Sequence, residues 1–430
     1  MGAVRRVLVL IDGEHYPPVV RDALARLAER GDAVAACVFV GGGEKLRDGI
    51  GDYGVPLADS VEEAIEVHLP DVVIDLSDEP VLGPRERLAL AGRVLALGVP
   101  YEGPGFRFEP PERLPIAVPS LAVVGTGKRV GKTAVVGHLA QLAARSMSVV
   151  AVAMGRGGPS EPEVVLGPPS LDELLARSRA GRHACSDHLE LALAAAIATV
   201  GARRCGGGLA GAMFFSNVLE AVERAQELGP ALVLLDGSGA AFPPVAADRT
   251  VLVAAASQDP LVASGYLNGF RARLADLIVV TMAEAGGAEV AQALATAARP
   301  GTPIVRAVLR PRPLEPVAGE RVAWFGAGGS AAAASAATHL AAEYDAQVVQ
   351  RSGDLADRRA LQAVLGQTDA DTFVVELKAA AIDVVAEEAV RRGVRFVFAV
   401  NDVVPLPGDD LDGELERLVG EATALQAAAR

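Results

Sequence analysis

Short apolar runs alternate with helical patterns along the chain, which predicts an α/β fold with mostly parallel sheets. In the first hundred residues the apolar runs are VLVLI at 7–11, VAACVFV at 34–40 and VVIDL at 72–76, with a last short strand near Val99. Helix-period stretches follow the first three runs, as at 22–29 and 85–97. Residues 1–101 are therefore predicted to form a small doubly wound α/β domain.

Two proline-rich segments divide the rest of the chain. Residues 102–119 hold five prolines and two glycines, which forbid a continuous helix or central strand and predict a linker. A second α/β series follows, and RPRPLEP at 310–316 closes it. Its predicted strands lie at 121–125, 149–154, 231–237, 250–256, 277–281 and 303–309. Residues 120–316 are predicted to form one domain.

A third α/β series, residues 317–430, completes the predicted three-domain organisation. Its apolar runs lie at 322–329, 346–350, 372–377 and 396–400. The GAGG turn at 326–329 has the form of a dinucleotide loop, but lone glycine-rich turns between strand and helix are common, so we favour a plain turn. The sequence does not indicate what this domain does.

Charge limits the classes of partner. The formal net charge of −14 argues against a nucleic-acid or acidic-membrane partner, because polyanion binding needs a cationic face. An anionic ligand would need a local basic pocket instead. Residues 113–160 contain no Asp or Glu and include six cations, which are Arg113, Lys128, Arg129, Lys132, Arg145 and Arg156. A chance gap in acidic residues is the alternative for Arg113 and Arg145.

The cysteines and the apolar runs indicate the compartment. Cys37, Cys185 and Cys205 form no CxxC pair, so neither a disulfide framework nor a zinc ribbon is predicted. Asp12 interrupts the N-terminal apolar run well short of a signal peptide, and no apolar run is long enough to span a membrane. We expect a soluble, cytoplasmic protein.

A glycine-rich loop between a strand and a helix is the strongest functional motif. In LAVVGTGKRVGKTAVVGHLAQLAA, which begins at residue 121, the helix starts at GKT. Such a loop wraps its backbone amides around an anion. We predict that Lys132 reaches the β- and γ-phosphates of ATP and that Thr133 binds Mg²⁺. The predicted ATP-binding residues are Gly125, Thr126, Gly127, Lys128, Arg129, Val130, Gly131, Lys132 and Thr133.

The loop departs from the strict G-x4-G-K-T spacing, because Thr126 stands where the first glycine is expected. GTGKRVGKT thus resembles the longer loop of dethiobiotin-synthetase-like P-loop ligases, and the central domain is predicted to be a P-loop NTPase. Asp236, at the end of LVLLD, is the predicted second Mg²⁺ ligand, although such residues also cap turns. Arg156, in GRGG after the second strand, is predicted to clamp a phosphate, with a solvated turn as the alternative.

Three further polar segments are candidates for an acceptor site. IDGEHYPP places Asp12, Glu14 and His15 at the carboxyl end of a parallel strand, where ligands bind; a capped turn is the alternative. In RHACSDHLE, zinc is rejected for lack of a fourth ligand, and Ser186 is expected to cap a helix. GARRCGGG is expected to be a loop in which Arg203 and Arg204 either hold a phosphate or lie at a hinge.

Together these stretches resemble the cyclic 2,3-diphosphoglycerate synthetase family essentially end to end. The likeness is carried by IDGEHYPP at 11–18, GTGKRVGKTA at 125–134, GRGGP at 155–159, SDH at 186–188 and RRCGGGLAG at 203–211. It implies ATP- and Mg²⁺-dependent closure of a phosphoanhydride within 2,3-bisphosphoglycerate, releasing ADP and phosphate. A plausible course is phosphorylation of one substrate phosphate, then attack by the other to expel inorganic phosphate.

The resemblance allows roles to be assigned, and a homodimer is possible. The predicted catalytic residues are Lys132, Lys128, Arg156, Asp236 and His15. The predicted substrate-binding residues are Asp12, Glu14, His15, Arg129, Arg156, His188, Arg203 and Arg204. One rival function is another P-loop kinase or carboxylate ligase. A second is a switch or partitioning ATPase, in which a lysine near the position of Lys128 acts across a dimer.

Overall fold

The computed structural model describes residues 4–46, 50–284 and 286–429, and it confirms the α/β class. Its first body is a six-stranded sheet in the order β3-β2-β1-β4-β5-β6, parallel except for the last pair. The elements are β1 (Arg5–Ile11), α1 (Pro17–Glu29), β2 (Asp32–Phe39), η1 (Gly43–Lys45), β3 (Leu57–Ala58), α2 (Val61–His68), β4 (Val72–Asp75), α3 (Pro84–Ala96), β5 (Tyr101–Gly103) and β6 (Phe106–Phe108).

Alternate residues of β1 are buried on opposite faces of this sheet. Val7, Val9 and Ile11 pack with α1, whereas Leu8 and Leu10 belong to the cluster that contains α2 and α3. The strand expected near Val99 begins at Tyr101, and residues 102–108, predicted as the start of a linker, form the β5–β6 hairpin instead. The hairpin gives Tyr101 a buried place beside Phe106.

The central part of the chain forms most of a second, 13-stranded sheet, in the order β10-β11-β9-β13-β8-β15-β16-β17-β21-β20-β18-β19 with β12 beside β11. Its elements are β7 (Leu114–Pro115), β8 (Ser120–Gly125), α4 (Lys132–Ala144), β9 (Val149–Gly155), β10 (Glu163–Val165), α5 (Leu171–Arg179), α6 (Asp187–Ala195), β11 (Ala198–Cys205), β12 (Phe215–Ser216), α7 (Val218–Glu227), β13 (Leu232–Asp236), β14 (Val245–Ala246), β15 (Arg249–Ala255), α8 (Pro260–Ser264), α9 (Asn268–Leu274), β16 (Leu277–Thr281), α10 (Ala288–Ala297) and β17 (Ile304–Pro313).

The C-terminal strands continue that same sheet. The elements are β18 (Arg321–Phe325), α11 (Gly329–Tyr344), β19 (Gln347–Ser352), α12 (Arg358–Leu365), β20 (Thr372–Glu376), η2 (Ala381–Ala386), α13 (Glu387–Arg392), β21 (Arg395–Pro405) and α14 (Leu411–Ala429). Long strands β17 and β21 pair antiparallel and join the two parallel halves. RPRPLEP, predicted to close the central domain, therefore lies partly within a strand.

The prolines of β17 are tolerated for a geometric reason. β16 pairs with β17 only as far as Arg306, and beyond it β21 is the only strand that pairs with β17 among the described residues. Pro311 and Pro313 thus lie in the part of β17 that has a paired strand on one side, which is where a residue without a backbone N–H fits.

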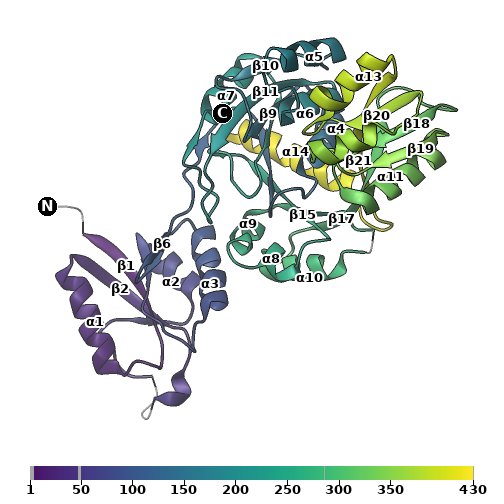
Figure 1. Cartoon of the computed structure of the whole chain (residues 1–430). Helices are drawn as coiled ribbons and strands as arrows, with labels where there is room; N and C mark the ends of the chain where they lie inside the picture. The colour runs from purple at the N-terminus through teal and green to yellow at the C-terminus, as the bar shows by residue number, and fades with distance from the viewer. Residues whose placement is uncertain (1–3, 47–49, 285, 430) are drawn as a thin grey trace.

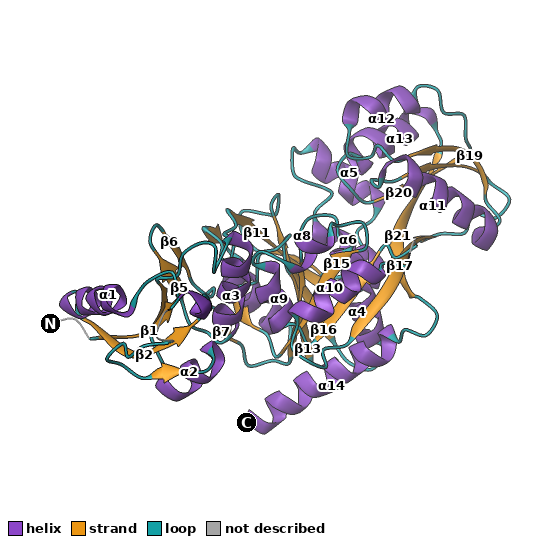
Figure 2. Cartoon of the chain, turned by 90° about the horizontal axis from the view of Figure 1, so that it is seen from below, coloured by secondary structure: helices purple, strands orange, loops and turns teal. Residues whose placement is uncertain are grey.

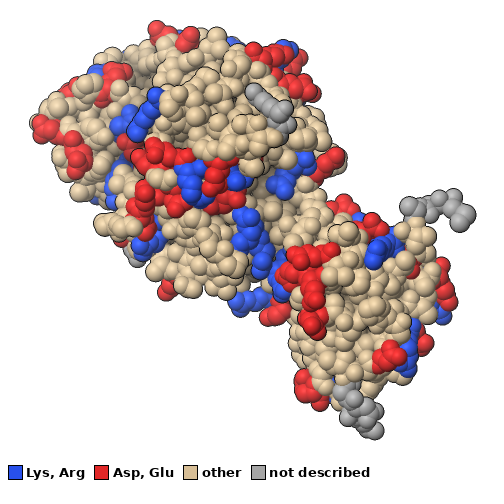
Figure 3. Space-filling model, turned by 180° about the vertical axis from the view of Figure 1, so that it is seen from behind, with Lys and Arg blue, Asp and Glu red and all other residues tan. Residues whose placement is uncertain are grey.

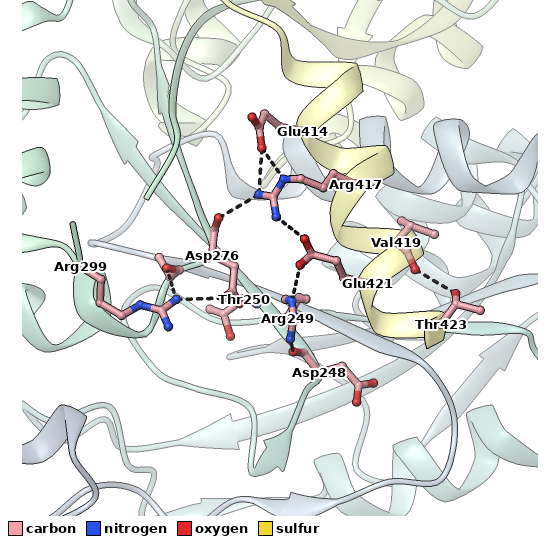
Figure 4. Close-up of polar contacts among 11 residues, drawn as sticks. Asp248, Arg249, Thr250, Asp276, Arg299, Glu414, Arg417, Val419, Glu421 and Thr423 are labelled. Carbon is pink, nitrogen blue, oxygen red and sulfur yellow. Dashed lines mark hydrogen bonds and ion pairs between the residues drawn. The ribbon is translucent and has the colours of Figure 1, made fainter. Parts of the chain in front are cut away.

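The last helix returns to the central part of the molecule. Leu411, Leu415 and Leu418 of α14 are fully buried in the cluster that holds the core residues of β8 and α4. Arg249 at the start of β15 donates to Glu421 at 2.7 Å, and Arg417 pairs with both Glu414 and Glu421 (Figure 4). The helix thus fastens the end of the chain to the domain that carries the glycine-rich loop.

The molecule is elongated, with the first sheet at one end and β18–β20 at the other (Figures 1 and 2). The first body docks through α3 against α9, where a Cβ atom on Gly92 would lie 3.1 Å from the backbone nitrogen of Phe270. Helices in the described part of the chain all fall short of the length and apolar character needed to cross a membrane.

Candidate functional site

The glycine-rich loop is held from behind by its neighbouring strands. Gly125 donates its backbone N–H to Gly239 at 3.1 Å and Thr126 donates to Val253 at 2.9 Å, while the Thr281 hydroxyl donates to the Val130 carbonyl at 2.8 Å. None of the backbone amides from residue 127 to residue 132 donates to another described residue. The loop therefore presents a row of free donors suited to phosphate.

Backbone strain accompanies this arrangement. Gly131, the N-cap of α4, has φ +78°, and a Cβ atom there would lie 3.1 Å from Leu309. Arg129 takes the left-handed region with φ 58°, which is uncommon outside glycine. Strained backbone conformations of this kind persist only where the surrounding structure fixes them, and they cluster at functional loops.

Lys132 and Asp236 form a buried ion pair beneath the loop. Lys132 Nζ lies 2.7 Å from Asp236 Oδ1, and the two side chains are 10% and 0% exposed. Burial raises the pKa of Asp236, and the Lys132 ammonium opposes that rise. Asp236 Oδ2 is buried without a partner in the described part of the chain. An oxygen in this state, near the start of α4 with Thr133, fits a role in holding a cation.

Two arginines approach the loop from neighbouring strands: Arg156 directly follows β9, and Arg204 lies near the end of β11. A Cβ atom on Gly239 would lie 3.0 Å from Nη2 of Arg156, 3.7 Å from Nη2 of Arg204 and 4.0 Å from the Gly127 carbonyl. Arg204 donates to the Ser238 carbonyl at 2.8 Å. Burial, and the charge of Arg156, lower the pKa of Arg204. Among the described residues neither arginine has an acidic partner, so the pair is suited to bind an anion.

The segment that carries Arg203 and Arg204 corrects one expectation. GARRC, expected to be a loop, is the end of strand β11. Successive residues of a strand point to opposite faces, and here Arg204 reaches the turn at Ser238 whereas the Arg203 guanidinium lies over Phe215, with 5.9 Å to the ring centroid. The geometry thus brings Arg204 to Arg156. The substrate role of Arg203 stays a prediction, as it does for the exposed Lys128 and Arg129.

His188 lies inside the protein. Its side chain is 2% exposed, and a Cβ atom on Gly201 would lie 2.6 Å from its ring. Its nearest charged neighbour is Glu163 at 3.5 Å. Ser186 precedes α6 as expected, but its side chain makes no capping hydrogen bond. The packing beneath β11 accounts for His188, and its role toward substrate stays a prediction.

A second polar site lies at the carboxyl edge of the first sheet. Asp12 is fully buried; its Oδ1 lies 2.7 Å from His15 Nδ1, and its Oδ2 accepts from the Asp78 amide at 2.5 Å. Glu14 pairs with Lys45. The turns after β1 and β2 touch so closely that a Cβ atom on Gly13 would lie 1.9 Å from the Gly42 carbonyl oxygen. Three strand-end turns are therefore assembled around Asp12.

The two sites belong to different sheets. No hydrogen bond or ion pair of the described residues joins residues 12–15 to the glycine-rich loop. Figure 3 shows, on one face, Lys and Arg side chains gathered where the first body meets the rest, beside a band of acidic side chains. Groups of three or more His, Cys, Asp or Glu placed to hold a metal are absent from the part of the chain that the structure describes.

Sequence reasoning gave no role to three charged residues, Asp187, Glu190 and Lys378. Asp187 raises the pKa of Asp236 and Lys378 lowers it, after the larger effects of burial and Lys132. Lys378 also forms an ion pair with Glu190 of α6. Asp187 lies in the SDH motif, of which only Ser186 and His188 were given a role, and Lys378 follows an apolar run that predicts nothing but a strand.

Comparison with known proteins gives matches along most of the chain. Three family models described as cyclic 2,3-diphosphoglycerate synthetase match it: the N-terminal domain at 6–109, the P-loop domain at 120–295 and the C-terminal domain at 313–402. The chain is 46% identical to the cyclic 2,3-diphosphoglycerate synthetase of Rubrobacter xylanophilus, with 97% of this chain and 98% of the relative covered.

Further relatives and one solved structure extend the comparison. The synthetase of Thermococcus onnurineus is 42% identical, with 94% of this chain and 96% of the relative covered. That of Methanothermobacter thermautotrophicus is 38% identical, with 99% and 98% covered. The ATP complex of LpxK from Aquifex aeolicus matches 72% of this chain and 90% of its own at 17% identity, with a TM-score of 0.45.

Proposed function

The chain belongs to the cyclic 2,3-diphosphoglycerate synthetase family and is an enzyme of the ATP-dependent ligase type, and from that premise we propose its reaction. The proposed reaction uses ATP and Mg²⁺ to close a phosphoanhydride between the two phosphates of 2,3-bisphosphoglycerate, with release of ADP and inorganic phosphate. A homodimer and a cytoplasmic location stay predictions.

The observation that carries this proposal is the pair Arg156 and Arg204. Both guanidiniums lie beside the glycine-rich loop without an acidic partner among the described residues. A substrate with two phosphates and a carboxylate repels ATP unless cations lie between them. The pair is positioned to hold one acceptor phosphate next to the loop that holds the γ-phosphate, which supplies the proximity that the reaction needs.

The residues of the P-loop domain have distinct tasks in this proposal. Lys132 stabilises charge on the transferred phosphoryl group, and the free amides of the loop hold the β- and γ-phosphates. Thr133 and Asp236 would hold Mg²⁺, which would neutralise charge on the phosphates. An oxygen of one substrate phosphate attacks the γ-phosphorus and displaces ADP; an oxygen of the second substrate phosphate then attacks the phosphorus of the first, and the transferred group leaves as inorganic phosphate. Arg156 and Arg204 hold the first substrate phosphate in place for these steps.

A phosphorus NMR experiment tests the proposal. The protein is mixed with Mg-ATP and 2,3-bisphosphoglycerate, and the spectrum is followed for a new anhydride signal with equal release of ADP and phosphate. A parallel ADP-release screen over phosphorylated glycerates and biotin precursors separates the reaction from that of a related kinase or carboxylate ligase. ADP release with another acceptor and none with 2,3-bisphosphoglycerate would overturn the proposal. Stimulation only by a macromolecule would indicate a switch ATPase.

A further inference from the structure

A lysine from the C-terminal strands reaches the P-loop domain. Lys378 follows β20 and forms an ion pair with Glu190 on α6; the two side chains are 34% and 14% exposed. The turn that carries it is fixed, because the Ala381 amide donates to the Lys378 carbonyl at 2.7 Å and Ala379 has φ 26°. A strained, well-fixed turn is a mark of a functional position.

The partner of Lys378 lies near the first turn of the P-loop helix. A small cavity of about 10 Å³ is lined by Thr133, Gly137, Glu190 and Asn401, among others. Asn401 of β21 donates to Glu376 at 2.6 Å, which ties the end of β20 to the part of β21 that lines this cavity with α4. The C-terminal strands thus form a wall beside the start of α4, and Lys378 stands on that wall.

The composition of the chain sets Lys378 apart. The sequence contains 36 arginines and only four lysines, which are Lys45, Lys128, Lys132 and Lys378. Lys45 pairs with Glu14 in the first polar site, and Lys128 and Lys132 belong to the glycine-rich loop. Arginine makes nearly all other ion pairs of the described residues. This is expected of structural ion pairs, because the planar guanidinium can donate two hydrogen bonds to one carboxylate. We therefore expect the remaining lysine, Lys378, to lie at a ligand-binding site as well.

The ion pair with Glu190 leaves Lys378 with capacity for a ligand. An ammonium group has three donors, and within the described chain the Lys378 ammonium donates only to Glu190. The Glu190 carboxylate is only 14% exposed, so the ion pair mainly compensates its buried charge and still leaves two donors of the ammonium for a ligand.

We infer that Lys378 binds a phosphate of the acceptor at the P-loop site, so that the C-terminal strands complete the active site; this rests on the proposed function. Glu190 holds the ammonium in place until the substrate binds. The inference gives the C-terminal part of the chain a direct task, which no motif in it indicates.

Four variants test this inference: Lys378→Met, Lys378→Arg, Glu190→Gln and the double variant Glu190→Gln/Lys378→Met. We expect Lys378→Met to raise the Kd for 2,3-bisphosphoglycerate, measured by calorimetry with a non-hydrolysable ATP analogue, at least tenfold, and Lys378→Arg to recover most of the affinity. The double variant should regain thermal stability, because no unpaired carboxylate remains, but not affinity. Arg358→Met is the matched control, because Arg358 pairs with Asp383 in the same region. This change should leave the affinity for 2,3-bisphosphoglycerate unchanged.

The outcomes separate the inference from the proposed function. Wild-type affinity in Lys378→Met, or full recovery of affinity in the double variant, would show that Lys378 is only an inter-domain contact. If the wild-type protein binds 2,3-bisphosphoglycerate but yields no anhydride, the proposed reaction fails while the Kd values still decide the role of Lys378. If the wild-type protein does not bind that ligand, both are overturned.

Discussion

Lys132 and Asp236 depend on each other, because each is the main compensation for the buried charge of the other. Their contact is 2.7 Å and Asp236 is fully buried. Removing one member of such a pair leaves an uncompensated charge in the interior, whereas removing both leaves none. Loss of activity in a single variant at either position therefore mixes a catalytic effect with a structural one.

We predict that Lys132→Ala lowers kcat by at least about 10³-fold, as expected for loss of a cation that stabilises the transferred phosphoryl group. The same change should lower the free energy of unfolding by about 3–5 kcal/mol. Lys132→Ala/Asp236→Asn should recover most of that stability and none of the activity, as measured by denaturant unfolding and ADP release. Near-normal turnover in a folded single variant would contradict the assignment of the loop.

Asp236→Asn separately tests the proposed metal role. The change keeps the shape of the side chain and removes its charge, so the Mg²⁺ concentration needed for half-maximal turnover should rise at least about tenfold. The measurement is turnover against Mg²⁺ at saturating ATP. Asp248, a carboxylate of the same domain that accepts from Ser120, provides the control as Asp248→Asn, which should leave the Mg²⁺ dependence unchanged. An unchanged dependence in Asp236→Asn would make Asp236 a turn residue only.

Single residues differ in how well sequence could place them. The glycine-rich loop is local, so GKT fixed the start of α4 at Lys132 correctly. The substrate role of His188 stays a prediction, and its burial depends on the close approach of Gly201 from β11, which no local pattern shows. Lys378 and Glu190 lie 188 positions apart in the chain, so no local pattern brings them together.

At the scale of elements, apolar runs predicted strands wherever burial requires large apolar side chains. β8, β9, β13, β15 and β16 appear within a residue or two of their expected places. β11 was missed because glycine, alanine and threonine supply much of its sequence, with α6 and α7 packed close to it. β17 was expected to end before its prolines, and the pairing with β21 that accommodates them is non-local.

The close packing of the GRGG loop on β11 predicts a sensitive position. A Cβ atom on Gly158 would lie 2.0 Å from the Ala202 carbonyl oxygen, so Gly158→Ala must displace the loop that carries Arg156. We expect kcat/KM for the acceptor to fall at least about tenfold and stability to fall by about 1–3 kcal/mol. Gly167→Ala is the control, because nothing lies within 4 Å of a Cβ atom there. Wild-type kinetics in Gly158→Ala would show that the position of Arg156 is unimportant.

At the scale of the whole molecule, the order of the strands along the chain was predictable, but the contacts between distant segments were not. The division into three domains stays a prediction. The continuity of the second sheet through β17 and β21, and the return of α14 to the core of the central part, arise from pairings between distant segments. These contacts place the C-terminal strands beside α4, which makes a shared active site geometrically reasonable.

The separation of the two polar sites leads to the last prediction. Asp12, Glu14 and His15 lie in the first sheet, with no hydrogen bond or ion pair among the described residues to the glycine-rich loop. If this site handles the acceptor, His15→Ala and Glu14→Gln should raise the KM for 2,3-bisphosphoglycerate or lower kcat at least about tenfold. Affinity for ATP should stay within about threefold of the wild-type value.

The matched control for these variants is His68→Ala, at the last turn of α2 in the same body. It should leave the kinetics with acceptor and the affinity for ATP unchanged. The measurements are initial rates against each substrate in turn and calorimetric binding of an ATP analogue. Asp12 is buried and holds the turn through His15 and the Asp78 amide, so a change there would disturb the fold and is a poor test. Lost ATP binding with unchanged acceptor kinetics would show that the first sheet handles the nucleotide, and the two substrates would have to exchange places in the proposed mechanism.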